Sequence, residues 1–208
     1  FGANNKYGVF PSFSAGWRLS EESFLQSGPF SDLKLRAGWG QTGNQEIPPK
    51  ITQPLFTATV GSSTSYPLDA SASYPAGITY SRLANPDIQW EVSTQMNLGL
   101  DFAFLNGSLS GAIDAFKKVS TNMLLEVIPA DPVQPASSVW TNVKNMEIVN
   151  QGVEMDLDYK FATESGIKFN VGGNLTLISN QVSGSPYSVI PSGSASGSGL
   201  TSATINGY

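Results

Sequence analysis

The chain contains neither cysteine nor histidine, and each absence excludes a class of site. Without cysteine there is no disulfide framework and no thiolate metal site, and without histidine the commonest general base and metal ligand is missing. A Ser-His-Asp set is therefore impossible, and no motif supports Ser-Lys chemistry. We interpret the chain as not an enzyme and expect no cofactor and no metal.

Charge and long apolar runs are also scarce. Charged residues make up only 13% of the 208 residues and the net charge is −5, which argues against nucleic acid as a partner. No run of 18 or more apolar residues occurs, so no transmembrane helix is predicted. The first residues read as loop rather than as a signal peptide. The 21 glycines and 13 prolines favour strands joined by loops.

Apolar and polar residues alternate without interruption over residues 153–161. The apolar set is Val153, Met155, Leu157, Tyr159 and Phe161, and the polar set is Glu154, Asp156, Asp158 and Lys160. Side chains alternate between the two faces of a strand, so this period predicts a β-strand with one apolar and one charged face. Such a strand is typical of an outer-membrane barrel wall, with lipid on one side and water on the other.

The same alternation predicts six strands in three hairpins. The predicted strands cover residues 8–19, 32–42, 88–104, 108–121, 148–161 and 167–180. Asn106-Gly107 predicts a two-residue turn of the primed type, which sets Phe104 opposite Leu109 and Gln95 opposite Lys118. This register brings the apolar faces of the two strands together, and a slip of one residue would separate them.

Short and long connections follow each other in turn, and the long ones cover residues 43–87, 122–147 and 181–208. Outer-membrane barrels alternate short periplasmic turns with long extracellular loops. The predicted strands also reach the roughly 9–11 residues needed to cross a bilayer. The fold class predicted is therefore all-β, with antiparallel up-and-down strands forming an arc of a large transmembrane β-barrel. A soluble β-sandwich, such as a surface module that binds carbohydrate, remains the alternative.

Four segments, in order, resemble the SusC/RagA family of TonB-dependent outer-membrane transporters of Bacteroidetes. They are residues 7–22 (YGVFPSFSAGWRLSEE), 33–45 (LKLRAGWGQTGNQ), 83–104 (LANPDIQWEVSTQMNLGLDFAF) and 142–158 (NVKNMEIVNQGVEMDLD). The resemblance covers most of the chain outside the long connections.

The resemblance implies that residues 1–208 are part of a receptor β-barrel domain of about 22 strands. The internal plug, the TonB-contacting segment and the signal peptide are expected to lie outside these residues. The resemblance also implies import of oligosaccharides or peptides, a SusD-like surface lipoprotein as partner, and energy from the TonB complex. Membrane lipid and lipopolysaccharide would surround the barrel in the outer membrane.

Carboxylates suggest two candidate sites, and each has a plainer interpretation. The row Glu154, Asp156 and Asp158 offers the oxygen ligands that Ca²⁺ prefers, but alternate residues on a strand splay apart, which favours a solvated inner wall. Glu21-Glu22 could be a catalytic pair, but adjacent side chains diverge. The segment from Ser20 is better interpreted as the capped start of a helical turn.

Aromatic residues divide into two groups. Those near predicted strand ends are interpreted as girdles at the lipid interface. They are Trp17, Trp39, Trp90, Phe102, Phe104, Tyr159 and Phe161. Aromatic residues in the long connections are the candidate ligand-binding residues, because flat rings stack well on sugars. They are Tyr66, Tyr74, Tyr80 and Trp140. Lys117 shares the lipid-facing parity and is expected to extend its amine to the outer headgroups.

Overall fold

The computed structural model describes residues 2–25, 28–59, 77–129, 136, 138–186, 189–195 and 199–205. The described chain forms two compact units, and the first consists of residues 1–9, 43–91 and 122–145. The second consists of residues 10–42, 92–121 and 146–208. Among the described residues, no helix has the length and apolar character that crossing a membrane requires.

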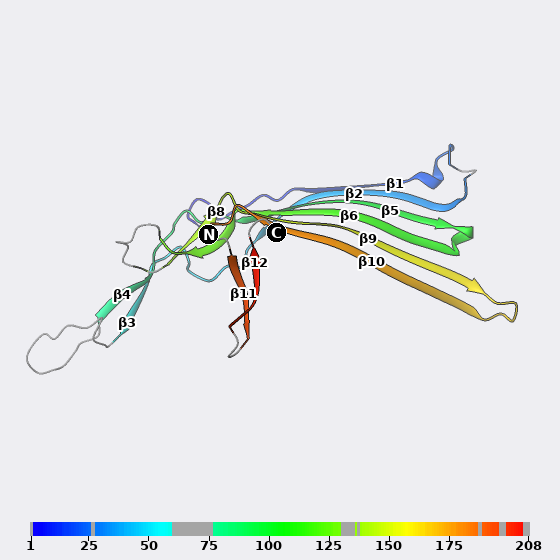
Figure 1. The fold of residues 1–208 in the computed structure, drawn as a ribbon. Coiled ribbons are helices and arrows are strands. Elements are labelled where there is room, and N and C mark those ends of the chain that lie inside the picture. The colour runs from blue at the N-terminus through cyan, green and yellow to red at the C-terminus, as the bar shows by residue number, and fades with distance from the viewer. Residues whose placement is uncertain are drawn as a thin grey trace, which may run out of the picture. The chain divides into compact units, whose positions relative to one another are not determined.

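The second unit is built on one sheet of six strands, in the order β1-β2-β5-β6-β9-β10 (Figure 1). The strands are β1 (Ser12–Arg18), β2 (Phe30–Asn44), β5 (Glu91–Phe104), β6 (Leu109–Thr121), β9 (Glu147–Ala162) and β10 (Lys168–Ser183). β1 pairs with β2, β5 with β6, β6 with β9 and β9 with β10, in each case antiparallel. The up-and-down order predicted from the sequence is confirmed.

Six further strands form three small hairpins outside the six-stranded sheet. They are β3 (Leu55–Thr59) with β4 (Gly77–Arg82), β7 (Met123–Val127) with β8 (Val139–Val143), and β11 (Val189–Ala195) with β12 (Gly199–Ile205). All six lie in regions that the sequence predicted as loops. Short 3-10 turns, η1 (Leu19–Glu21) and η2 (Leu105–Gly107), follow β1 and β5.

The predicted hairpin register is confirmed along the β5–β6 ladder. Phe104 lies opposite Leu109, and Gln95 lies opposite Lys118. The N–H of Ser108 donates to the carbonyl of Leu105 across the turn (3.1 Å). Asn106 and Gly107 both have positive φ, as a primed turn requires. Leu105 also has a positive φ, which the sequence did not indicate.

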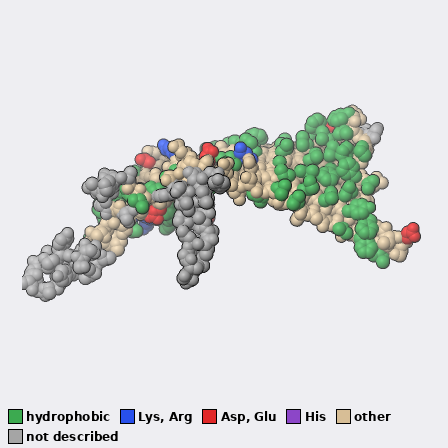
Figure 2. Space-filling model, in the orientation of Figure 1, with side chains coloured by type: hydrophobic (Ala, Val, Ile, Leu, Met, Phe, Trp, Pro, Cys, Tyr) green, Lys and Arg blue, Asp and Glu red, His purple; other side chains and the backbone are tan. Residues whose placement is uncertain are grey.

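Each long strand presents one apolar and one polar face. The apolar face consists of Phe13, Ala15, Trp17, Leu35, Ala37, Trp39, Met96, Leu98, Leu100, Phe102, Phe104, Ile113, Ala115, Val153, Met155, Leu157, Tyr159, Phe161, Phe169, Val171, Leu175 and Leu177. Figure 2 shows hydrophobic side chains gathered over the strands. The apolar face is open: Phe13 is 70% exposed, Leu157 42% and Leu177 63%. A β-sandwich would bury this face against a second sheet, so the soluble-sandwich alternative is contradicted.

Two strand starts were predicted too early. β1 begins at Ser12 and not at residue 8, and Val9 precedes it with 88% of its surface exposed. β5 begins at Glu91 and not at residue 88. Ile88 is fully buried in the first unit, and the Trp90 indole N–H donates to the Asn5 carbonyl (2.9 Å). The apolar spacing continues the period of two beyond both strand starts, although Val9 is exposed and Ile88 packs in the core of the first unit.

The capped helical turn predicted from Ser20 is also wrong. Leu19–Glu21 is a single 3-10 turn without a side-chain cap. The Ser20 hydroxyl lies 3.1 Å from Asp32 Oδ1 instead, and Glu22 Oε1 accepts a hydrogen bond from the Trp17 indole (2.8 Å). Polar side chains here therefore serve the neighbouring strand and an exposed tryptophan rather than a helix.

Replacing Leu157 by arginine tests the orientation of the apolar face. In the full-length protein, Leu157→Arg is expected to lower the free energy of unfolding by roughly 2–4 kcal/mol, the cost of an arginine facing lipid near the midplane. Chemical unfolding in lipid vesicles measures this loss. The control is Asn174→Arg on the polar face, and equal losses for the two variants would contradict the assignment.

Candidate functional site

The polar face of the sheet is the first candidate surface, and an arginine network is its best-defined feature. Arg36 on β2 makes a two-bond contact with Asp101 on β5, from Nε to Oδ2 and from Nη2 to Oδ1, both 2.8 Å. The same Nη2 donates to Asp114 Oδ2 on β6 (3.0 Å). One guanidinium thus joins three neighbouring strands through charge-assisted hydrogen bonds.

Gly99 makes this network possible. It lies opposite Asp114 in the β5–β6 ladder, between the arginine and its second carboxylate. A Cβ on Gly99 would overlap Asp114 Oδ1 and come within 2.8 Å of Arg36 Cζ. With a side chain at this position, the Arg36 guanidinium and the Asp114 carboxylate would have to shift from the positions in which they meet. The alternation pattern did not predict this network, although the charged residues on the polar parity were a signal for it.

A hollow of about 340 Å³ lies beside the network on the polar face. Its lining includes Ser14, Gly16, Lys34, Arg36, Gly38, Asn97 and Gly99. Three of these residues are glycines, so the floor is backbone and the rim carries hydroxyl, amide and cationic groups. Such a surface can form hydrogen bonds with polar solutes.

The carboxylate row continues the polar face on β9. Glu154 lies opposite Asp114 and Thr176, and Asp156 lies opposite Ala112 and Asn174. No group of three or more acidic side chains within the described residues has the geometry to hold a metal ion. This arrangement is that of a solvated wall.

An apolar spot interrupts the polar face toward the long connections. Phe116 lies on the polar parity, and a Cβ on Gly152 would come within 2.9 Å of its ring. Ile178, opposite Gly152, is 58% exposed on the same face. Two large apolar side chains therefore lie on this otherwise polar wall.

The predicted girdle aromatics form two groups on the apolar face. Near the short connections, the Phe161 ring centroid lies 5.5 Å from that of Tyr159 and 5.1 Å from that of Phe169. Toward the long connections, Trp39 stacks on Phe13 at 5.2 Å. Trp90 belongs to neither group, because it lies before β5.

The first unit is the second candidate surface, and it has a small core of its own. Ile51, Ile88 and Leu124 are buried together, with Ile47 and Trp140 packed against them. Trp140, a predicted ligand-binding residue, therefore packs against the interior of this unit. Its carbonyl also accepts a hydrogen bond from Asn85 (2.8 Å).

Hydrogen bonds from polar side chains hold the first unit together. These side chains belong to residues 83–104 and 142–158, two of the segments that resemble the SusC/RagA family. The Asn142 amide donates to the carbonyls of Gln89 (3.0 Å) and Asn122 (2.9 Å) and accepts from the Gln89 N–H (2.8 Å). Glu91 accepts from the Leu124 N–H (2.8 Å) and from Asn44 (2.5 Å). These residues link described parts of two long connections to the segment before β5, a role that the alternation pattern could not indicate.

The β3–β4 hairpin holds Tyr80. The Phe56 and Tyr80 rings lie opposite each other with centroids 4.4 Å apart. Ile78, of the same parity, is 73% exposed, and Tyr80 is 42% exposed. We call Phe56, Ile78 and Tyr80 the hairpin face. Tyr66 and Tyr74, the remaining predicted ligand-binding residues, lie outside the described residues.

A single sheet of long antiparallel strands with an open apolar face and a polar opposite face is the wall of a membrane-spanning β-barrel. Comparison with known proteins agrees. Residues 1–205 match the family described as "TonB dependent receptor-like, beta-barrel". The chain belongs to this family, whose members are proteins of the outer membrane.

Individual relatives support the SusC/RagA resemblance. The chain is 32% identical to the TonB-dependent receptor SusC of Bacteroides thetaiotaomicron over 189 residues, which are 88% of this chain and 18% of that protein. It is also 32% identical to the TonB-dependent receptor P26 of Formosa agariphila, with 87% and 17% covered. A solved structure of the RagAB peptide transporter aligns with all of this chain and 21% of that one, at a TM-score of 0.75 and 25% identity. The chain thus spans about a fifth of the length of these relatives.

Substitution of Gly99 tests the arginine network. Gly99→Ala is expected to lower the stability of the full-length barrel by about 1–3 kcal/mol, because a methyl group displaces the Arg36 and Asp114 side chains. Combining it with Asp114→Ala should cost less than the sum of the single changes, since the overlap with the carboxylate is removed. Thermal unfolding in detergent measures both effects.

Gly173→Ala is the matched control, because a Cβ there meets nothing within 4 Å. Strictly additive losses in the double variant, or an equal loss for Gly173→Ala, would show that Gly99 does not accommodate the network.

Proposed function

We propose that this chain is part of the barrel wall of an active transporter that imports oligosaccharides or peptides across the outer membrane. The observation that carries the proposal is the six-stranded sheet with opposite apolar and polar faces, in a chain of the TonB-dependent receptor family. The family is one of receptors and transporters and not of enzymes. We assign no catalytic role to the segment.

The polar face supports a water-filled or plugged interior. Its charged and amide groups, and the glycine-floored hollow beside Arg36, would line the space through which a hydrophilic substrate moves. Energy would come from the inner-membrane TonB complex through parts of the protein outside this segment. One solved relative is the RagAB peptide transporter, which favours substrates of the oligosaccharide or peptide class over small ions.

The hairpin face supports contact with a further component. A two-stranded hairpin is marginally stable by itself in water, and this hairpin leaves Phe56, Ile78 and Tyr80 exposed on one side. We propose that the hairpin face lies near the outer entrance, where it meets substrate or a SusD-like surface lipoprotein. Of the two candidate ligand-binding residues that the structure describes, Tyr80 has an exposed ring paired with a second aromatic ring, whereas Trp140 packs against the small core.

Uptake by cells that carry the full-length gene tests the proposal. Deletion of the gene should abolish growth on the cognate oligosaccharide or peptide, identified by screening labelled glycan and peptide pools. Tyr80→Ala should raise the substrate concentration needed for half-maximal uptake by roughly two- to tenfold, because one aromatic contact with the substrate is lost.

Thr79→Ala is the control. Thr79 is adjacent to Tyr80 in β4 and lies opposite Thr57, so its side chain is on the other side of the hairpin. Unchanged uptake of every pool in the deletion strain would contradict the transport function. Equal uptake by the Tyr80 and Thr79 variants would contradict only the role of the hairpin face.

A further inference from the structure

Three polar side chains cross the apolar face in one row near its edge. Lys117 on β6 lies opposite Gln151 on β9, and Gln151 lies opposite Ser179 on β10. All three are exposed and have the parity of the apolar face. We call these three residues the Lys117 row.

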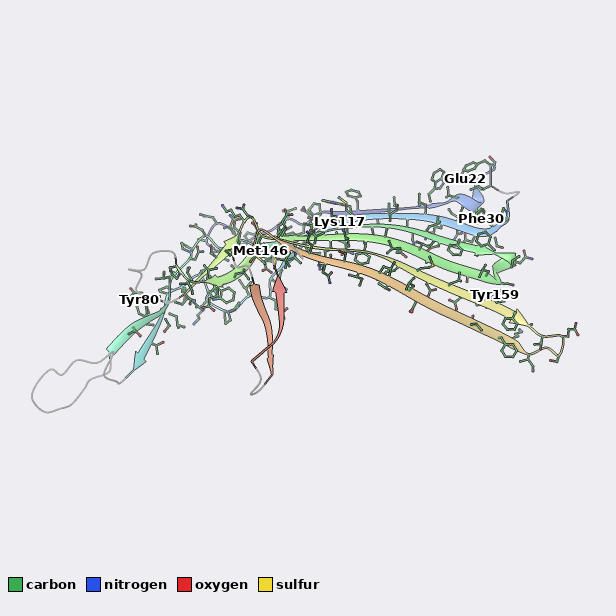
Figure 3. The ribbon with its side chains drawn as sticks, viewed as in Figure 1. Glu22, Phe30, Tyr80, Lys117, Met146 and Tyr159 are labelled. Carbon is green, nitrogen blue, oxygen red and sulfur yellow. The ribbon has the colours of Figure 1, made fainter. Side chains whose placement is uncertain are left out.

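The Lys117 row interrupts the apolar face on β6, β9 and β10, whereas Met96 lies opposite Lys117 on β5 and Val119 and Val149 share the parity beyond the row. The adjacent row toward the short connections is wholly apolar and consists of Ala115, Val153 and Leu177. Figure 3 shows Lys117 and Tyr159 toward opposite ends of the long strands. From Gln151 to Phe161 on β9 the strand advances roughly 33 Å, or about 25 Å of height at a ~40° tilt, the height of the apolar band of an outer-membrane barrel.

Within the described residues, the side chains of the Lys117 row form no hydrogen bond or ion pair, although their backbones pair in the ladders. The row offers ammonium, amide and hydroxyl donors on adjacent strands spaced ~4.8 Å apart. Glu147 is the acidic residue of this parity on β9. It lies two residues beyond Val149, farther from the apolar band. The row thus combines the cationic ammonium of Lys117 with the amide of Gln151 and the hydroxyl of Ser179, and it contains no carboxylate.

We propose that the Lys117 row binds a phosphate group of lipid A in the outer leaflet. A phosphate offers several anionic oxygens to donors on neighbouring strands, and lysine binds it as a point charge. The row adjoins Ala115, Val153 and Leu177, so acyl chains of the same molecule would lie on apolar side chains. This continuity favours a lipid phosphate over a free one. The inference rests on the orientation in the proposed function, with the long connections outside.

Lipid A retention by the full-length protein tests this inference. The protein is placed in phosphatidylcholine nanodiscs with lipid A, and the lipid A bound per barrel is measured by native mass spectrometry after release into mild detergent. Lys117→Gln is expected to weaken retention about fivefold, the factor that one lysine contributes at an anionic surface. Lys118→Gln is the matched control, because Lys118 is adjacent in β6 but faces the polar side opposite Gln95.

Two further arms identify the source of the phosphate. With dephosphorylated lipid A, wild type and Lys117→Gln should bind equally, and excess inorganic phosphate should not displace lipid A from wild type. Equal retention by the Lys117 and Lys118 variants would overturn the proposal, as would displacement by inorganic phosphate. Because the readout is bound lipid, failure here leaves the uptake test of the transporter function unaffected.

Discussion

Backbone hydrogen bonding within the bilayer is the constraint on which this structure depends. Lipid offers no partner to an N–H or C=O group, so a spanning sheet must pair its strands with one another. The ladders that join β6, β9 and β10 do this over most of their length. β1 and β10 lie at the edges of the six-stranded sheet, and the sheet is therefore an arc whose closure needs further strands.

Glycine within the strands is a consequence of packing on this wall. Large side chains cross from one strand to the next, and a glycine lies under each of three such crossings. Gly99 lies beneath Arg36, Gly111 beneath Phe102 and Gly152 beneath Phe116, each with a would-be Cβ within 2.9 Å of the crossing side chain. Glycine weakens an isolated strand. In this sheet it leaves room for a large side chain of the neighbouring strand to lie across it, on either face.

The sequence predicts the wall well because local signals fix it. Alternation assigns residues 153–161 to two faces, and Asn106-Gly107 sets a register that a single slip would destroy. The partners of Arg36 could not be predicted, because a long excursion separates β2 from β5 and no tight turn sets that register. Ile88 was misassigned for a related reason: its spacing continues the strand pattern, whereas its burial depends on Ile51 and Leu124, which are distant in sequence. The hairpins in the long connections have weak alternation and were missed.

The central claim is that one face of the six-stranded sheet meets lipid and the other meets water. Because the segment has no cysteine of its own, single cysteines can be placed in turn at residues 153–161 of β9 in the full-length protein, with any other cysteines removed. Each variant is then spin-labelled in lipid vesicles. Collisions with oxygen should peak at the odd positions and collisions with a water-soluble nickel reagent at the even ones, with a period of two. Equal access of the nickel reagent to both sets would contradict the account.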